Sequence, residues 1–322
     1  MKTICVVVPT YNEESNINDI YERVTNLFIT SLKQYKYNIL FIDNCSKDNT
    51  RNLIRDLCAR DKNVKAIFNA KNFGFNRSLF YGLSQATGDC AVLMFADMQD
   101  PPEVIPNFVK EWENGNKIVC GIKTKSKENP IKYFFRKCYY KLIENISEID
   151  HINQFDGFGL YDKSFIEVLK NIDDSLPYLR GIVAELGFKR SEVSYEQSKR
   201  KKGKSSFNFM ALYDLAMLGI TSYSKVIMHL ATILGAIISS ISALIAIVIF
   251  IVKICNWNAF PLGTAAIQIG IFFLGAIQLF FIGFVGEYIV NMNVRTMHHP
   301  IVIEESRLNF DIEKIEDNIW VS

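Results

Sequence analysis

The 322-residue sequence lacks several features by which common classes of protein are recognised. Its seven cysteines are odd in number and include no C-x-x-C pair, so the sequence predicts neither a zinc site nor a disulfide framework. No G-x-G-x-x-G or G-x-x-x-x-G-K-S/T loop follows the first apolar run, which disfavours a dinucleotide-binding site or a P-loop. The net charge of +2, from 36 basic and 34 acidic residues, argues against a nucleic-acid partner.

Charged residues are also missing from one long part of the chain. Between residues 226 and 286 the only charged side chain is Lys253, whereas the rest of the chain has the charge density of a soluble domain. Two apolar runs, 226–252 and 263–286, each exceed the roughly 20 residues needed to cross a bilayer. Two buried core helices are the competing interpretation, but uncharged runs of this length are rare in soluble folds. The sequence therefore predicts a C-terminal hairpin of two transmembrane helices.

Basic residues flank both ends of this predicted hairpin. Most of residues 199–204 are Lys or Arg and Arg295 follows the second run, whereas the connecting loop has only Lys253 at its edge. The positive-inside rule then places both termini in the cytoplasm, and no signal-peptide pattern is present to export the first 220 residues. We expect a multi-pass protein of the inner (cytoplasmic) membrane. Its parts are a cytoplasmic domain at 1–205, a juxtamembrane amphipathic helix at 206–224, two transmembrane helices at 225–290 and a cytoplasmic tail at 291–322.

Short β-branched runs alternate with longer amphipathic stretches in the soluble part. This alternation predicts an α/β fold with a mainly parallel sheet and helices on both faces. The expected strands are 4–8, 38–42, 64–68, 90–95 and 117–121, and the expected helices are 16–32, 49–60, 76–86 and 103–114.

Polar residues follow three of the expected strands, at the sheet edge where ligands bind in such folds. The segments are PTYNEE at 9–14, DNCSKDNT at 43–50 and DMQDPPE at 97–103. Carboxylates repel phosphate unless a cation bridges them, and Asp97 and Gln99 can offer oxygens to one divalent ion that also takes substrate phosphates. Each segment alone also fits a turn or a helix cap. The prediction of a site therefore depends on their meeting at one edge.

The order and spacing of several segments resemble the polyisoprenyl-phosphate glycosyltransferases of glycosyltransferase family two, relatives of dolichyl-phosphate mannose synthase. The resemblance extends from Met1 to about Glu305. It is carried by PTYNEE at 9–14, D-x-x-S-x-D-x-T at 43–50, NFGFNRSLFYGLSQATGD at 72–89, ADMQDPPE at 96–103, LRGIVAELGFK at 179–189 and RKKGKSSF at 200–207.

The resemblance implies a GT-A fold and inverting transfer of a hexose from a nucleotide-sugar donor to a polyprenyl phosphate such as undecaprenyl phosphate. It also implies a divalent cation, Mg²⁺ or Mn²⁺. UDP-glucose or UDP-galactose is the favoured donor because the hairpin looks bacterial, and GDP-mannose is the alternative. Pairing of the tail from Pro300 to Ser322 with a second copy is implied by analogy alone.

Individual roles carry over to the positions that match the family's motifs. The resemblance implies donor binding by Pro9, Tyr11, Glu13, Asp43, Asp97 and Gln99, metal ligation by Asp97 and Gln99, catalytic roles for Asp97, Asp156 and Arg200, and phosphate contacts by Lys123, Arg136 and Arg200. The chemistry agrees, since a phosphate monoester is already ionised at pH 7 and needs no strong base. It does need cations to bring two anions together, for which Arg and Lys are suited.

Four positions depart from the family pattern. Phe95 stands where an Asp is usual, Asn44 where a second Asp is common, Lys123 where Arg is common and Ser206 where Lys is usual. Phe95 removes a candidate metal ligand, which leaves open a second class of function, a non-catalytic membrane nucleotide-sugar binder. A processive polysaccharide synthase would carry Q-x-x-R-W and more spans, and the sequence has neither.

Two amphipathic stretches, 130–146 and 207–222, are expected to lie in the plane of the membrane interface. They would open the active site toward the lipid surface. The alternative is that both are core helices of the soluble domain.

Overall fold

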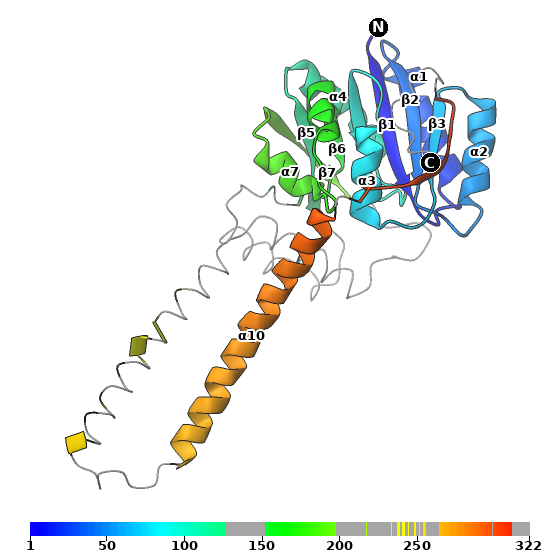
Figure 1. Ribbon diagram of the computed structural model, residues 1–322. Coiled ribbons are helices and arrows are strands. Elements are labelled where there is room, and N and C mark those ends of the chain that lie inside the picture. Colours follow the sequence, from blue (N-terminus) through cyan, green and yellow to red (C-terminus); the bar gives the residue numbers. More distant parts are fainter. Residues whose placement is uncertain are drawn as a thin grey trace.

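The computed structural model describes residues 1–125, 152, 154–197, 217, 264–297 and 299–310, with single positions between 233 and 255. These residues form one eight-stranded sheet in the order β7-β5-β6-β4-β1-β2-β3-β8, with a long helix leaving it (Figure 1). The strands are β1 (Thr3–Thr10), β2 (Lys36–Asp43), β3 (Val64–Asn69), β4 (Cys90–Leu93), β5 (Ile118–Lys125), β6 (Gly159–Asp162), β7 (Arg190–Glu196) and β8 (Glu304–Leu308).

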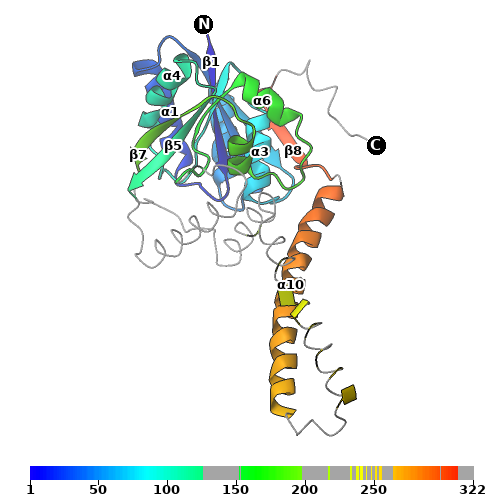
Figure 2. The same ribbon diagram turned by 90° about the vertical axis from the view of Figure 1, so that its left-hand side faces the viewer.

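Helices cover both faces of this sheet, as predicted. One face packs against α1 (Ile17–Thr30), α2 (Thr50–Arg60), the short η1 (Pro102–Val104) and α4 (Ile105–Glu113). The other packs against α3 (Phe75–Ser84), α6 (Lys163–Lys170) and α7 (Leu179–Glu185). Figure 2 shows α1 and α4 on one side of the sheet and α3 and α6 on the other.

The two hydrophobic cores account for the apolar runs in the sequence. Ile4, Val6 and Val8 of β1 face one core, whereas Cys5 and Val7 face the other. A strand that is buried on both faces carries consecutive apolar residues rather than alternating ones. The free thiols of Cys5, Cys58, Cys90 and Cys120 are buried among these apolar residues.

Strand direction gathers distant residues at one edge of the sheet. β1 to β4 are parallel to one another, and β6 is antiparallel to both β4 and β5. The carboxyl ends of β1, β2, β4, β5 and β7 therefore share an edge with the amino end of β6. Sequence analysis predicted β1 to β5 and the helices between them. It did not predict the antiparallel strands β6 and β8 or the edge strand β7.

The helix α10 (Thr264–Thr296) extends away from the sheet (Figure 1). Its segment Ile277–Thr296 is long and apolar enough to cross a membrane, and none of the segment is buried within the protein. Apart from isolated positions, the other predicted span, 226–252, lies outside the described residues. The structure thus describes one apolar C-terminal helix, and the two-helix hairpin is not shown.

The chain returns to the sheet after α10. Arg295 lies 3.2 Å from Asp174 of the soluble body, and β8 then pairs antiparallel with β3. The chain between these elements reaches the edge where β3 ends, because Glu304 is opposite Asn69. The apolar helix therefore lies next to the sheet edge at which β1, β2 and β4 end.

Candidate active site

The loops after β1 and β2 are joined by hydrogen bonds between backbone and side chains. The amide of Asn12 donates to the Ser46 hydroxyl at 2.9 Å, and the Asn12 side-chain oxygen accepts from the Lys47 amide at 2.8 Å. The amide of Glu13 donates to the Thr50 hydroxyl at 2.9 Å. Asn12 and Cys45 both have positive φ, a backbone conformation that non-glycine residues keep only when their surroundings enforce it. The two loops therefore form one preorganised unit.

Asp43 lies beneath this unit and has no exposed surface. Its carboxylate accepts hydrogen bonds from the hydroxyl and the amide of Ser46, and lies 3.0 Å from the guanidinium of Arg51. Burial raises the pKa of Asp43, although Ser46 and Arg51 oppose that shift. In this arrangement Asp43 fixes the loop 43–50, and its direct contact with a nucleoside stays a prediction.

Asn44 takes a role that an aspartate could not fill. Its amide nitrogen donates to the side-chain oxygen of Asn72 at 2.8 Å, while its amide oxygen accepts from Phe73 and Asn69. A carboxylate only accepts when ionised, so an Asp here would lose the bond to Asn72. Asn44, which departs from the family pattern, thus links the end of β3 to the loop after β2.

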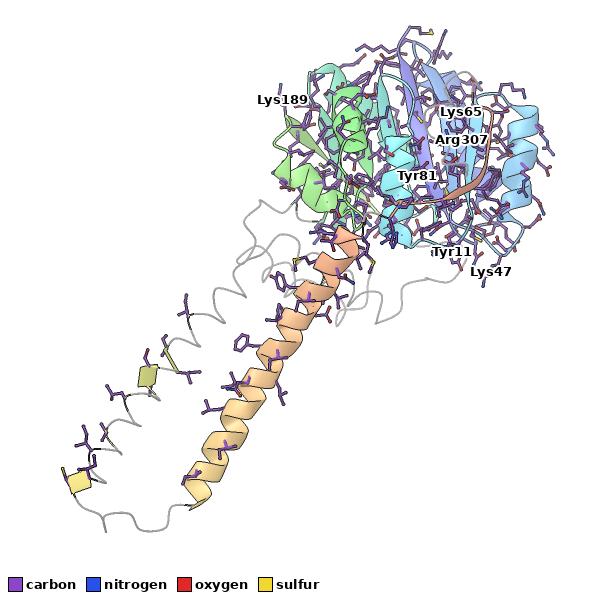
Figure 3. The ribbon with its side chains drawn as sticks, viewed as in Figure 1. Tyr11, Lys47, Lys65, Tyr81, Lys189 and Arg307 are labelled. Atoms are coloured by element: carbon purple, nitrogen blue, oxygen red, sulfur yellow. The ribbon has the colours of Figure 1, made fainter. Side chains whose placement is uncertain are left out.

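The other predicted donor residues of this region lie around the same loops. Pro9 is the next-to-last residue of β1 and lies opposite Ile42 of β2. The buried Glu13 accepts from the Asn16 amide group at 2.7 Å and so supports the start of α1. Tyr11 is partly exposed, and Figure 3 shows it close to Lys47 at the edge of the body from which α10 departs.

The loop after β4 carries Asp97 and Gln99, both partly exposed. The Asp97 carboxylate accepts from the amide of Gln99 at 3.1 Å, and the Gln99 side-chain oxygen accepts from Gln197 at 3.4 Å. Met98 between them has a φ of 57°. This turn holds two oxygen-bearing side chains on a constrained backbone.

Phe95 packs instead of presenting a ligand. Its ring centroid lies 5.6 Å from that of Phe75, and it contacts both hydrophobic cores. The acidic residue that the resemblance implies here is thus replaced by a residue that packs between α3 and the loop after β4.

Four side chains from separate elements form a buried polar cluster beside this loop. Lys123 of β5 lies 2.5 Å from the carboxylate of Asp156 and 3.9 Å from that of Asp100. The Tyr195 hydroxyl of β7 donates to Asp100 at 2.6 Å. These residues meet because β5 and β7 end, and β6 begins, at this edge of the sheet.

The cluster is electrostatically coupled. Burial raises the pKa of Asp100, the neighbouring Asp156 raises it further, and Lys123 opposes the shift. Burial lowers the pKa of Lys123, but Asp156 and Asp100 outweigh it, so the net shift is upward and Lys123 stays charged. Shifts of this kind at a strand edge are typical of functional sites.

The described residues include no group of three or more His, Cys, Asp or Glu side chains that could hold a metal. Asp97 and Gln99 nevertheless offer hard oxygen donors, and Mg²⁺ or Mn²⁺ often takes one or two protein carboxylates and completes its shell with water and substrate phosphates. The side-chain oxygens of Asp97 and Gln99 therefore fit a divalent cation that binds together with a nucleoside diphosphate.

Several predicted features lie outside the described residues. They are Arg136, Arg200, Ser206, the basic run 199–204 and both amphipathic stretches, 130–146 and 207–222, except Met217. Lys123, for which the resemblance implies phosphate contact, is placed by the structure against Asp156 and Asp100.

Sequence analysis missed three residues of the site. Asp100 lies in the same motif as Asp97, and its position directly before two prolines is the sequence feature that could have identified it. Tyr195 lies in a charged strand that had no apolar pattern, and Arg51 in an ordinary helix.

Comparison with known proteins gives the following relatives. Residues 5–204 match the family model described as Glycosyl transferase family 2. The Prophage bactoprenol glucosyl transferase homolog of Escherichia coli (strain K12) is 32% identical over 92% of this chain and 96% of its own. The Bactoprenol glucosyl transferase of Shigella phage SfX is 33% identical over 94% of this chain and 99% of its own. Among solved structures, the mannosyltransferase PcManGT from Pyrobaculum calidifontis, in complex with GDP-Man and Mn2+, aligns with a TM-score of 0.45 and 16% identity over 92% of this chain and 86% of that chain.

Proposed function

The chain belongs to glycosyltransferase family 2, and from this premise we propose that it transfers glucose from UDP-glucose to a polyprenyl phosphate, such as undecaprenyl phosphate, with inversion at the anomeric carbon. UDP-galactose and GDP-mannose are the alternative donors. The relatives named bactoprenol glucosyl transferase support both the glucose and the lipid acceptor.

One observation carries this proposal. The paired loops after β1 and β2, the Asp97 turn and the Lys123 cluster all lie at the sheet edge to which the chain returns from an apolar helix of membrane-spanning length. A lipid phosphate resides at the membrane surface, whereas a nucleotide sugar is dissolved in water. An enzyme that joins them needs a polar site next to a membrane anchor.

The proposed reaction needs little general base catalysis from the protein. An oxygen of the acceptor phosphate forms the bond to the anomeric carbon, and the bond from that carbon to the nucleoside diphosphate breaks with its electron pair on the diphosphate. The acceptor is ionised at pH 7, so positioning and charge stabilisation supply the catalysis.

The residues of the site divide these tasks in our proposal. Asp97 and Gln99 would hold a divalent cation, which when bound supplies positive charge for the departing diphosphate. Asp156, anchored by Lys123, would face the sugar. Arg136 and Arg200 would hold the acceptor phosphate, since guanidinium groups bind phosphate with two parallel hydrogen bonds.

We further propose that the chain is an inner-membrane protein with its catalytic domain and both termini in the cytoplasm. The exposed apolar side chains of α10, among them Ile267, Ile271, Leu279 and Ile282, support insertion of this helix into lipid.

The proposal is tested by transfer of labelled sugar into organic-extractable lipid. The full chain in detergent, with Mg²⁺ or Mn²⁺ and undecaprenyl phosphate, is given UDP-glucose, UDP-galactose or GDP-mannose. We expect transfer from UDP-glucose, and a loss of about a hundredfold in kcat in Asp97→Ala, a magnitude typical of removing one electrostatic contact to the transition state.

Asp56→Ala is the matched control, because Asp56 is exposed on α2, and it should transfer sugar at the wild-type rate. Full activity in Asp97→Ala would contradict the assigned site. Nucleotide binding without turnover for any donor would contradict the proposed reaction and favour the non-catalytic binder suggested by Phe95.

A further inference from the structure

The strand that follows the apolar helix is irregular where it meets the sheet. β8 pairs with β3, with Arg307 opposite Ile67 and Ser306 opposite Phe68, but the register shifts between Phe68 and Asn69. In a regular strand, residues three apart lie on opposite faces. Here Glu304 and Arg307 form an ion pair at 2.5 Å. A bulge, which inserts one extra residue into a strand, accounts for this pairing.

Two neighbouring glutamates of β8 contact helices on opposite faces of the sheet, as successive residues of a strand do. Glu304 accepts from the Tyr81 hydroxyl of α3 at 2.7 Å, whereas Glu305 lies 2.7 Å from Arg51 of α2. These helices cover opposite faces of the sheet. Figure 3 shows Tyr81 and Arg307 near one another beside the C-terminal strand. Consecutive glutamates of one strand thus contact two helices on opposite faces of the sheet.

Arg51 connects Glu305 to the loop after β2. Its guanidinium lies 3.0 Å from Asp43, donates to the carbonyl of Asn69 at 3.3 Å and lies over the Phe68 ring at 5.1 Å. Asp43 in turn holds Ser46. A chain of direct contacts therefore runs from the strand after the apolar helix to the loop 43–50.

We propose that Glu305 is a positioning residue for the donor nucleotide, acting through Arg51 and Asp43 on the loop 43–50. The inference rests on the proposed function and on the donor-binding role that the family resemblance implies for Asp43. Its consequence is that donor affinity depends on the contact between Glu305 and Arg51, so the strand that follows the apolar helix and the donor site are coupled.

The size of the effect follows from burial. Glu305 is about half exposed and Arg51 is mostly buried, so removing the Glu305 charge should have the modest effect of a surface pair, about threefold in nucleotide affinity. Removing the Arg51 charge leaves the buried Asp43 without its cation, and the loss should be tenfold or more. If Glu305 acts only through Arg51, the two losses will not add.

The experiment measures dissociation constants of UDP and GDP by calorimetry on the full chain in detergent. Glu305→Gln should weaken binding of the preferred nucleotide about threefold, with kcat unchanged and KM for the donor raised. Glu304→Gln is the matched control on the same strand and should leave affinity unchanged. In the Arg51→Gln background, Glu305→Gln should have no further effect. Asp43→Asn, which removes the carboxylate on which Arg51 acts, serves as the background if Arg51→Gln does not fold.

Three results would overturn the inference. The first is equal weakening by Glu305→Gln and Glu304→Gln, which would indicate general loosening of β8. The second is unchanged affinity in Glu305→Gln while Asp43→Asn weakens binding. The third is unchanged affinity in Asp43→Asn itself, which would remove the proposed donor site from this loop and the inference with it.

Discussion

Replacing Lys123 with Met removes the cation that lies 2.5 Å from Asp156 and 3.9 Å from Asp100, while nearly keeping the side-chain volume. The Lys123 side chain is 14% exposed, Asp156 22% and Asp100 1%. Removing one partner of a buried ion pair costs about 3–5 kcal/mol because the remaining charge is left unpaired. Since Asp156 is partly exposed, we expect Lys123→Met to lower the free energy of unfolding by about 3 kcal/mol, the lower end of this range.

Thermal unfolding of the full chain in detergent measures this loss. At about 2–4 °C per kcal/mol for a domain of roughly 200 residues, Tm should fall by about 6–12 °C. Lys117→Met is the matched control, because Lys117 pairs with Asp162 at 3.1 Å but is 46% exposed, and its loss should stay below about 1 kcal/mol. Adding Asp156→Asn to Lys123→Met should recover part of the loss, because one unpaired carboxylate is removed. Equal reductions of Tm in the two lysine variants would refute this reasoning.

Two further predictions concern stability. Burial raises the pKa of Asp162, but hydrogen bonds from Ser164, Trp112 and Lys117 outweigh it and lower the pKa to about 2, from 3.8. The unfolded chain therefore binds more protons between these values, so the stabilisation is present above about pH 4 and is lost as pH falls toward 2. Asp162→Ala should cost about 1–2 kcal/mol of unfolding free energy at pH 7, after allowance for solvent screening. Its Tm should also fall less steeply than that of the wild type between about pH 4 and 2, and an unchanged slope would contradict this. A Cβ on Gly159 would lie 2.3 Å from the backbone oxygen of Val119, so Gly159→Ala should lower Tm by several degrees or prevent folding. Gly275→Ala is the control and should leave Tm unchanged, because a Cβ there would have nothing within 4 Å. Equal Tm values for the two variants would show that β5 and β6 are not so closely paired.

Most of the sheet could be predicted because β1 to β5 are apolar runs separated by amphipathic helices. β7 (RSEVSYE) and β8 (EESRL) could not, because both lie at the ends of the sheet, where charged residues protect an unpaired edge and remove the apolar pattern. β6 (GLYD) is as short as β4 (CAVL), but it lacks the continuous apolar run by which β4 could be predicted. The strands that could not be predicted are therefore the two at the edges and one that is both short and mixed in composition.

Only part of the candidate site could likewise be predicted from the sequence. Asp43 ends one parallel strand and Asp97 and Gln99 follow another. Such strand ends share an edge, so the place of these residues at one edge of the sheet was predictable. The partners of Lys123 were not, because they depend on how β5, β6 and β7 pair. The contact between Arg51 and Glu305 joins residues 254 positions apart and follows from the return of the chain after α10.

Transfer of glucose to undecaprenyl phosphate can be measured by mass spectrometry of the lipid that the full chain forms from undecaprenyl phosphate and an equal mixture of UDP-glucose, UDP-galactose and GDP-mannose. We expect one hexose joined to undecaprenyl phosphate, derived from isotopically marked UDP-glucose, and no such product from Asp97→Ala. Formation of no hexosyl lipid by the wild-type chain, or equal formation by Asp97→Ala, would contradict this expectation.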